Sequence, residues 1–289
     1  MDLLKLESLT GDGVISRLLY REEVTSTNDM IMEIARQGYP EKALALCEIQ
    51  TAGRGRKGRH WESPAGSGIW MSLLLHPQRK DLLLSSITLL AALAITRSIN
   101  EELLEMGFAD SSQTLRNNTD TKTSSSSILN AQIKWPNDVI VGSKKVCGIL
   151  TEMISDGTNN NIIVGIGINV NQTAFPEELL EKGISLAMAT GRQWNRESLV
   201  VRVIKHLVLL EDEFENVGDL SPFLEEYNSL LISKDKEVVL TADNIDFPDN
   251  PYTARGITKT GALIVEDKMG KSHDISFGEV SVRGLLGYV

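Results

Sequence analysis

The sequence lacks the features that mark several classes of protein. It has no run of about 18 consecutive apolar residues, so no transmembrane helix is expected. The N-terminal Met-Asp-Leu-Leu-Lys-Leu-Glu has neither the apolar segment of a signal peptide nor the arginine-rich character of a transit peptide. Only 2 of the 289 residues are cysteine and 4 are histidine, and no Cys-x-x-Cys pair occurs, which argues against a zinc site. These absences predict a cytoplasmic protein without membrane association.

The sequence is acidic and contains enough apolar residues for a sizeable core. Its formal net charge is -10, so general binding to nucleic acids or acidic membranes would meet electrostatic repulsion. Hydrophobic residues make up 42% of the chain, and its length predicts one large domain, alone or followed by a small one. Cys47 and Cys147 lie in apolar runs, which predicts two buried free thiols in a reducing compartment.

One segment departs from this acidic background. Residues 50–61 read Gln-Thr-Ala-Gly-Arg-Gly-Arg-Lys-Gly-Arg-His-Trp, and residues 53–59 contain three glycines and four cationic side chains. Glycine lets backbone N–H groups approach a ligand closely, and clustered cations repel one another unless an anion joins them. We therefore predict that this basic loop, residues 50–61, is flexible and orders around a phosphate or a carboxylate.

The basic loop has two other interpretations. Gly53 and Gly58 have the spacing that opens a Walker A loop, but Arg59-His60 stands where Lys-Ser/Thr is required. A nucleotide-binding P-loop is therefore not expected. An arginine-rich RNA-binding patch stays open as an alternative from this segment alone, although the acidic remainder of the chain disfavours it.

Apolar periodicity predicts an α/β arrangement up to about residue 232. Buried strands are expected over residues 43–49, 69–75, 133–134, 139–141, 146–154 and 161–170, and helices over residues 81–106, 197–214 and 222–231. A further helix is expected to begin among the capping residues 24–29 and to stop at Gly38. Residues 111–127 include 12 Ser, Thr or Asn residues, which predicts a disordered surface insertion at about residues 110–129.

The pattern changes after Ser233. Short strands separated by turn residues are expected over residues 237–240, 254–257, 262–265, 273–276 and 279–282. Five such strands in a short stretch predict a small β-barrel. The sequence therefore predicts a first domain of residues 1–232 and a second of residues 233–289.

Three further segments carry polar residues in unusual places, and each also has an ordinary structural explanation. Residues 133–139, Ile-Lys-Trp-Pro-Asn-Asp-Val, could form only a turn. Residues 144–152 place Lys145 three positions before Gly148, and this lysine could be an exposed hairpin residue. Residues 165–171, Gly-Ile-Gly-Ile-Asn-Val-Asn, fail the dinucleotide-binding fingerprint because Val170 takes the third glycine position and no helix follows.

Together, and in this order, the basic loop and these three segments closely resemble the motifs of biotin protein ligases. Residues 26–28, Ser-Thr-Asn, also match the family's early biotin-site segment, and the resemblance extends over residues 20–289. It implies an α+β fold: a catalytic domain like that of class II aminoacyl-tRNA synthetases, with a mixed sheet and helices, and a small C-terminal SH3-like barrel. Only about 20 residues precede the matched region, so the resemblance predicts the monofunctional type without a DNA-binding domain or repressor activity.

The resemblance implies a two-step reaction. Biotin and MgATP give biotinyl-5′-adenylate and pyrophosphate, and a lysine of the biotin carboxyl carrier domain of acetyl-CoA carboxylase then attacks the adenylate. The alternative is a lipoate or octanoate ligase or transferase of related fold; the complete basic loop and the SH3-like tail argue against it. The resemblance leaves a weak homodimer open.

The resemblance also implies roles for individual residues. The biotin-binding residues would be Ser26, Thr27, Asn28, Gln50, Gly53, Arg54, Arg56, Lys145, Gly148 and Gly165, with both glycines making room for the biotin rings. The ATP- or adenylate-binding residues would be Arg56, Arg59, Trp61, Lys134, Asn137, Asp138 and Asn169. Lys145 would bridge the biotin carboxylate and the α-phosphate, Arg56 would also be catalytic and retain the adenylate, and Asp138 would be the Mg²⁺ ligand.

Overall fold

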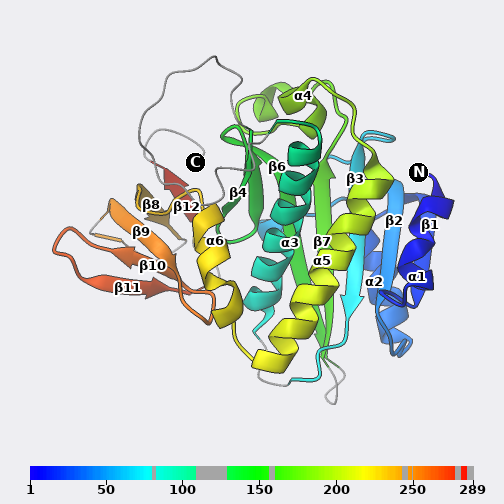
Figure 1. Ribbon diagram of the computed structural model, residues 1–289, viewed down its shortest axis with the longest axis horizontal. Helices are drawn as coiled ribbons and strands as arrows, with labels where there is room; N and C mark the ends of the chain where they lie inside the picture. Colours follow the sequence, from blue (N-terminus) through cyan, green and yellow to red (C-terminus); the bar gives the residue numbers. More distant parts are fainter. Residues whose placement is uncertain are drawn as a thin grey trace.

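Two β-sheets organise the chain, one of seven strands and one of five. The structure is a computed structural model. It describes residues 1–79, 83–108, 129–155, 160–242, 247–248, 250–276 and 281–284. Figure 1 shows the larger sheet with its helices, and the smaller sheet beside it at the C-terminal end of the chain.

The seven-stranded sheet is mixed, as expected. Its strands are β1 (Arg17–Val24), β2 (Ala43–Gln50), β3 (Gly68–Leu75), β4 (Ala131–Lys134), β5 (Asp138–Val141), β6 (Lys144–Ser155) and β7 (Asn160–Asn169). Their spatial order is β1-β2-β3-β7-β6-β5-β4. Strands β1 and β2 are parallel, and all other neighbouring pairs are antiparallel.

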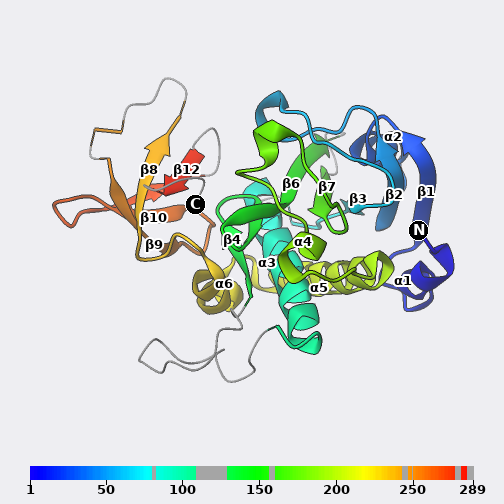
Figure 2. The same cartoon turned by 90° about the horizontal axis from the view of Figure 1, so that it is seen from above.

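Helices cover both faces of this sheet. The long helices α3 (Leu84–Glu105) and α5 (Arg196–Val217) lie side by side on one face, and α2 (Thr27–Arg36) lies on the other (Figures 1 and 2). Side chains alternate along a strand, so one strand supplies both cores. In β2, Leu44 and Leu46 belong to the large core with α3 and α5, whereas Ala43 and Ala45 pack with α2.

Helix α2 begins and ends as its sequence predicts. The Ser26 hydroxyl accepts a hydrogen bond from the Asn28 backbone N–H, which caps the first turn. Gly38 follows the helix with φ +76°, a conformation that suits glycine. The cap therefore fixes residues 26–28, the expected start of the site, at a defined helix N-terminus.

Short helical segments complete the chain. They are η1 (Leu3–Leu6), α1 (Ser8–Gly11), η2 (Arg56–Gly58), η3 (Glu177–Leu179), α4 (Leu186–Thr190), η4 (Ser221–Phe223) and α6 (Leu224–Leu230). No helix among the described residues is both long and apolar enough to cross a membrane.

The C-terminal sheet has the five expected strands in antiparallel order. They are β8 (Glu237–Thr241), β9 (Tyr252–Ile257), β10 (Leu263–Glu266), β11 (Ser272–Ile275) and β12 (Ser281–Gly284), arranged β11-β10-β9-β8-β12. This sheet is consistent with the expected SH3-like domain; within the described ranges β11 and β12 are its two edges and do not pair with each other. The smaller sheet lies beside the larger one, with α6 in contact with β9 and β4, and Trp135 Nε1 donates a hydrogen bond to Gly261 O at 3.1 Å.

Most expected elements are confirmed within a few residues, but strand β1, helices α1 and α4 and the short segments η1–η4 were not expected. Strand β1 was missed because its charged residues give no clear alternation, as befits an exposed edge strand. Helix α4 was missed because five residues are too few for a periodic pattern. The expected insertion at 110–129 lies almost entirely outside the described residues, as do Asp81 and Glu279, where a helix and a strand were expected to start.

Candidate active site

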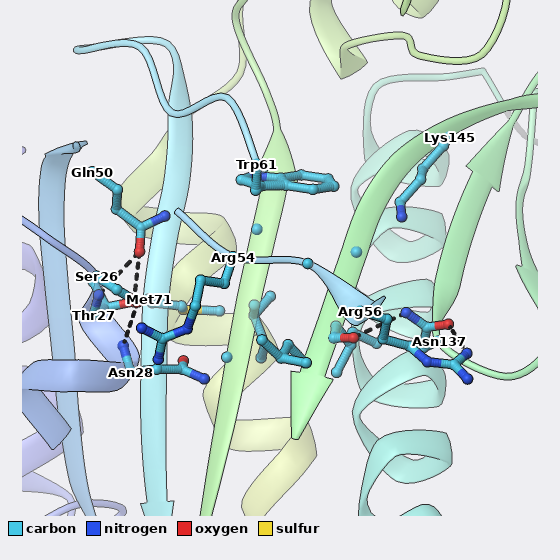
Figure 3. A pocket seen from close by; sticks show the side chains of 17 residues that line it. Ser26, Thr27, Asn28, Gln50, Arg54, Arg56, Trp61, Met71, Asn137 and Lys145 are labelled. Carbon is cyan, nitrogen blue, oxygen red and sulfur yellow. Dashed lines mark hydrogen bonds between the residues drawn. The ribbon is translucent and has the colours of Figure 1, made fainter. Parts of the chain in front are cut away.

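A pocket lies where the N-terminus of α2, the basic loop and strands β6 and β7 meet. It encloses about 460 Å³ of empty space, part of which is open to solvent. Most of the residues predicted for the site line it (Figure 3): Ser26, Thr27, Asn28, Gln50, Arg54, Arg56, Trp61, Asn137, Lys145, Gly148 and Gly165. Four segments that are distant in the sequence therefore form one site.

One end of the pocket is polar, with its side chains fixed by hydrogen bonds. Gln50 Oε1 accepts from the Thr27 backbone N–H at 3.0 Å and from the Thr27 hydroxyl at 3.3 Å. Gln50 Nε2 donates to Ser63 Oγ at 2.9 Å, which sets the orientation of the amide. This end can recognise a compact polar group by a fixed pattern of donors and acceptors.

The basic loop forms a closed turn. Trp61 N–H donates to Gly53 O at 2.9 Å, and Gly55 N–H donates to Arg59 O at 2.7 Å. A Cβ on Gly53 would lie 2.4 Å from the Trp61 carbonyl oxygen, so a larger residue would force this turn apart. The Arg54 guanidinium is tied to two carboxylates, Asp29 at 2.8 Å and Glu152 at 3.4 Å.

Trp61 covers strands β6 and β7 because glycines leave room for its ring. A Cβ on Gly148 would lie 2.8 Å from the Trp61 ring, and one on Gly167 would lie 2.5 Å from Trp61 Nε1. A Cβ on Gly165 would lie 2.2 Å from the Asn28 side-chain oxygen. We expected Gly148 and Gly165 to make room for the biotin rings; here that space holds the side chains of Trp61, Lys145 and Asn28.

The Lys145 side chain reaches the pocket because strand β6 contains a β-bulge. Residues three apart on a regular strand face opposite sides, so Lys145 and Gly148 would not share a surface. The register shifts between β5 and β6, where Val139 pairs with Cys147 but Ile140 pairs with Lys145. A Cβ on Gly148 would lie 3.0 Å from Lys145 Nζ, so both residues face the pocket.

The ammonium group of Lys145 has defined neighbours. Its Nζ lies 2.6 Å from Asp138 Oδ1 and 5.1 Å from the centre of the Trp61 ring. The backbone of Lys145 is held by residues 182–184: its N–H donates to Lys182 O at 2.7 Å, and its carbonyl accepts from Ile184 N–H at 3.0 Å. The Lys145 side chain therefore points into the pocket next to Trp61 (Figure 3), with the Asp138 carboxylate as its ion-pair partner.

The other end of the pocket gathers cations. Arg56 Nη1 donates to Asn137 Oδ1 at 2.8 Å, and Asn137 Nδ2 donates to Ile149 O at 3.0 Å. Burial lowers the pKa of Arg56; the Asp138 carboxylate opposes that shift and the nearby Arg59 guanidinium adds to it. Because arginine remains charged in proteins, this end offers a partly desolvated cation to an anionic ligand.

Lys134 adds a titratable cation behind this end. Its side chain is buried, and burial lowers its pKa to about 8. The charges of Lys145 and Arg283 act in the same direction, whereas Asp138 opposes them. A bound anion would reverse this shift by stabilising the ammonium.

Five of the predicted residues do not line the pocket: Gly53, Arg59, Lys134, Asp138 and Asn169. Gly53 and Asp138 act on residues that do, through the Trp61 backbone and the Lys145 ammonium. Arg59 is exposed, on the turn beside Arg56. Asn169 is buried, and its Oδ1 accepts a hydrogen bond from Gln172 Nε2 at 3.1 Å, away from the pocket.

Several residues of the site were not predicted. Those that line the pocket are Gly55, Met71, Ile149, Leu150, Ile166 and Gly167. Ser72, Ser63, Asp29 and Glu152 do not line it but bond to residues that do. A usable signal existed for Glu152, which closes the Lys-x-x-Gly-Ile-Leu-x-Glu segment, and none for Ser72 inside an apolar strand.

Comparisons with known proteins agree with this fold and site. The model of the biotin/lipoate A/B protein ligase family matches residues 20–169, and that of the biotin protein ligase C-terminal domain matches residues 244–283. The structure of biotin protein ligase from Aquifex aeolicus in complex with biotin and ATP is 29% identical, with a TM-score of 0.71 over 93% of this chain and 99% of that chain. The chain belongs to the biotin/lipoate A/B protein ligase family.

Curated relatives are longer than the aligned region. The bifunctional ligase/repressor BirA of Bacillus subtilis is 36% identical over 195 residues, which are 66% of this chain and 51% of that protein. BirA of Escherichia coli is 27% identical over 271 residues, which are 90% of this chain and 72% of that protein. The match thus spans about half the length of the Bacillus subtilis protein. The family matches confirm the resemblance to biotin protein ligases that the sequence motifs indicated.

Proposed function

We propose that this chain is a biotin protein ligase, which activates biotin with ATP and transfers it to a lysine of a carrier protein. The observation that best supports this proposal is the shape and polarity of the pocket. Its neutral polar end is formed by Thr27 and Gln50 and its cationic end by Arg56, and Lys145 lies between the two ends. Biotin has a polar ureido group at one end and a carboxylate at the other. The two ends therefore match the two ends of the pocket.

The first step joins two anions, and the site offsets their repulsion. A biotin carboxylate oxygen attacks the α-phosphorus of ATP, the bond from that phosphorus to the bridging oxygen breaks, and pyrophosphate leaves with the electron pair. Lys145 would contact the attacking carboxylate and the α-phosphate, and Arg56 the phosphate. Preorganised cations stabilise the charge of such a transition state.

The second step needs an amine and a protected intermediate. The amine of the acceptor lysine attacks the acyl carbon, an amide bond forms, a proton is released, and AMP leaves. Trp61 and the turn of the basic loop would cover the adenylate and exclude water from it. Arg56 would hold its phosphate until the acceptor arrives.

A magnesium ion could be held at this site mainly by the phosphates of bound ATP. No cluster of three or more acidic, histidine or cysteine side chains that could hold a metal occurs in the described part of the chain. Mg²⁺ at nucleotide sites often uses one or two carboxylates with substrate phosphates and water. Asp138, beside Lys145 at 2.6 Å, would be that carboxylate, and the ion would neutralise phosphate charge.

A lipoate or octanoate ligase is the alternative within the same family, and the polar end of the pocket argues against it. The dithiolane ring of lipoate offers no hydrogen-bond donors to Gln50 or Thr27. We expect pyrophosphate release from MgATP to depend on biotin, with lipoate and octanoate giving less than about one hundredth of that rate. Release with lipoate at the biotin rate would assign the chain to the alternative.

The remaining parts of the proposal concern partners and boundaries. We propose the biotin carboxyl carrier domain of a carboxylase as acceptor, a domain boundary near residue 232, and no specific DNA binding, in keeping with the net charge of -10. The free edge of β1, which pairs only with β2 among the described strands, would allow a weak homodimer. The free buried thiols of Cys47 and Cys147 favour a reducing, cytoplasmic location.

The lowered pKa of Lys134 leads us to expect that ATP binding depends on pH. With a pKa of about 8, the Lys134 amine is mostly protonated at pH 7, and its positive charge is lost as the pH rises through 8. If that charge holds ATP phosphates, the KM for ATP should be flat below pH 7.5 and rise roughly tenfold by pH 9.5. The Lys134→Met variant should have a high KM that does not change over this range. An identical pH profile in both proteins would remove Lys134 from ATP binding.

A further inference from the structure

Behind the polar end of the pocket, a chain of hydrogen bonds runs away from the residues that would touch a ligand. Ser72 Oγ, fully buried, donates towards Asn28 Oδ1 at 2.5 Å and towards Thr27 Oγ1 at 2.7 Å. Asn28 Nδ2 donates to Glu152 Oε2 at 2.5 Å. Asn28 is 4% exposed, so its amide has almost no access to water as an alternative partner.

Glu152, the last residue in this series of hydrogen bonds, determines how the side chains of Asn28 and Ser72 are oriented. An ionised carboxylate only accepts hydrogen bonds, so Glu152 requires the Nδ2 side of the Asn28 amide and turns Oδ1 towards Ser72. Ser72 has a single hydroxyl proton, which Asn28 Oδ1 and Thr27 Oγ1 compete for. The state of Thr27 Oγ1 at the pocket wall therefore depends on a residue that does not line the pocket.

Glu152 has a second contact, with the basic loop. Its Oε2 lies 3.4 Å from Arg54 Nη2, and the other partner of Arg54 is Asp29 at 2.8 Å. Asp29 also accepts a hydrogen bond from the Thr25 hydroxyl at 3.1 Å. Two carboxylates, Asp29 and Glu152, therefore bind the Arg54 guanidinium, and of these two Glu152 is the one that also accepts a hydrogen bond from Asn28.

We propose that Glu152 is a positioning residue: through Asn28 and Ser72 it sets the donor and acceptor pattern that the pocket presents to the ureido group. This rests on the proposed biotin ligase function. Glu152→Gln keeps the size of the side chain but allows its own NH₂ to face Asn28. An unsatisfied or reversed hydrogen bond at the buried Asn28 amide should raise the KM for biotin about 10-fold to 100-fold. The kcat at saturating biotin should stay within about 3-fold, since the reacting atoms are not touched.

A compensating pair of substitutions tests the orientation directly. Asn28→Asp alone places a second carboxylate against Glu152 and should also raise the KM for biotin. In the double variant Asn28→Asp, Glu152→Gln, the new amide can donate to the new carboxylate, which still accepts from Ser72. The KM for biotin should then return to within a few-fold of that of the unmodified protein. A double variant no better than either single one would overturn the proposal.

Asp29→Asn is the matched control, because it removes the other carboxylate from Arg54 and leaves Asn28 untouched. It should raise the KM for biotin less than about 3-fold. Equal effects of Asp29→Asn and Glu152→Gln would mean that only the tether on Arg54 matters, and would contradict a role through Asn28. An unchanged KM in Glu152→Gln would do the same. If the unmodified protein shows no biotin-dependent pyrophosphate release, the proposed function fails instead, so the two failures are distinguishable.

Discussion

Replacing Lys145 with alanine should lower the rate of biotin-dependent pyrophosphate release by on the order of 100-fold to 1,000-fold, the usual cost of removing one preorganised charge from a transition state. Lys145 Nζ sits between Asp138 at 2.6 Å and the Trp61 ring, on a backbone held by residues 182–184. It is therefore placed where negative charge develops. Biotin affinity should fall much less than the rate, because Gln50 and Thr27 hold the other end.

The measurement is pyrophosphate release and biotin affinity in parallel for the same variant. Lys144→Ala serves as the control, since Lys144 Nζ donates to Leu180 O at 2.7 Å on the exposed side of the same strand. It should keep nearly the full rate. Near-normal release by Lys145→Ala would remove this residue from the mechanism.

The second large effect concerns Arg56. Arg56→Gly should leave adenylate synthesis detectable but weaken retention of the product about 10-fold to 150-fold, the loss expected for one charge-assisted hydrogen bond of roughly 1.5–3 kcal/mol. Arg56 is partly buried beside Asn137 at 2.8 Å, where a phosphate contact would be shielded from water. Released biotinyl-adenylate would then acylate exposed lysines on unrelated proteins.

To test this, each variant is incubated with biotin, MgATP and an unrelated lysine-rich protein, and that protein is probed for biotin. Lys57→Gly is the matched control, because Lys57 is exposed in the same turn and already has φ 58°, which glycine tolerates. It should not label the bystander. An unlabelled bystander with Arg56→Gly, while adenylate is still made, would show that another group retains the product.

The sequence motifs predicted the site better than any single motif could justify. Taken alone, Lys145 could be a hairpin lysine and Asn137 only a turn residue. Their order along the chain carried the prediction, and the structure places both in the pocket that Arg56 and Gln50 also line. The elements were predictable for a similar reason: strands such as β3 and β7 are continuous apolar runs with clear ends.

What could not be predicted depends on contacts between distant residues. The odd spacing of Lys145 and Gly148 on one strand makes sense only with the bulge at Val146, which strand periodicity does not reveal. In the sequence, Ser72 is one polar residue within an apolar strand. Its role becomes visible only in the structure, where it donates a hydrogen bond to Asn28. Gly148 and Gly165 line the pocket, and the side chains next to them are the Trp61 ring and the Asn28 amide.

The most direct test of the proposed function is transfer of biotin to a purified carrier domain of acetyl-CoA carboxylase, followed by mass spectrometry of the intact domain. The account predicts the mass of one added biotinyl group when biotin and MgATP are both present. No addition should occur without ATP, with lipoate in place of biotin, or on a carrier whose acceptor lysine is replaced by arginine. An unmodified carrier domain under the complete conditions, or equal labelling without ATP, would contradict it.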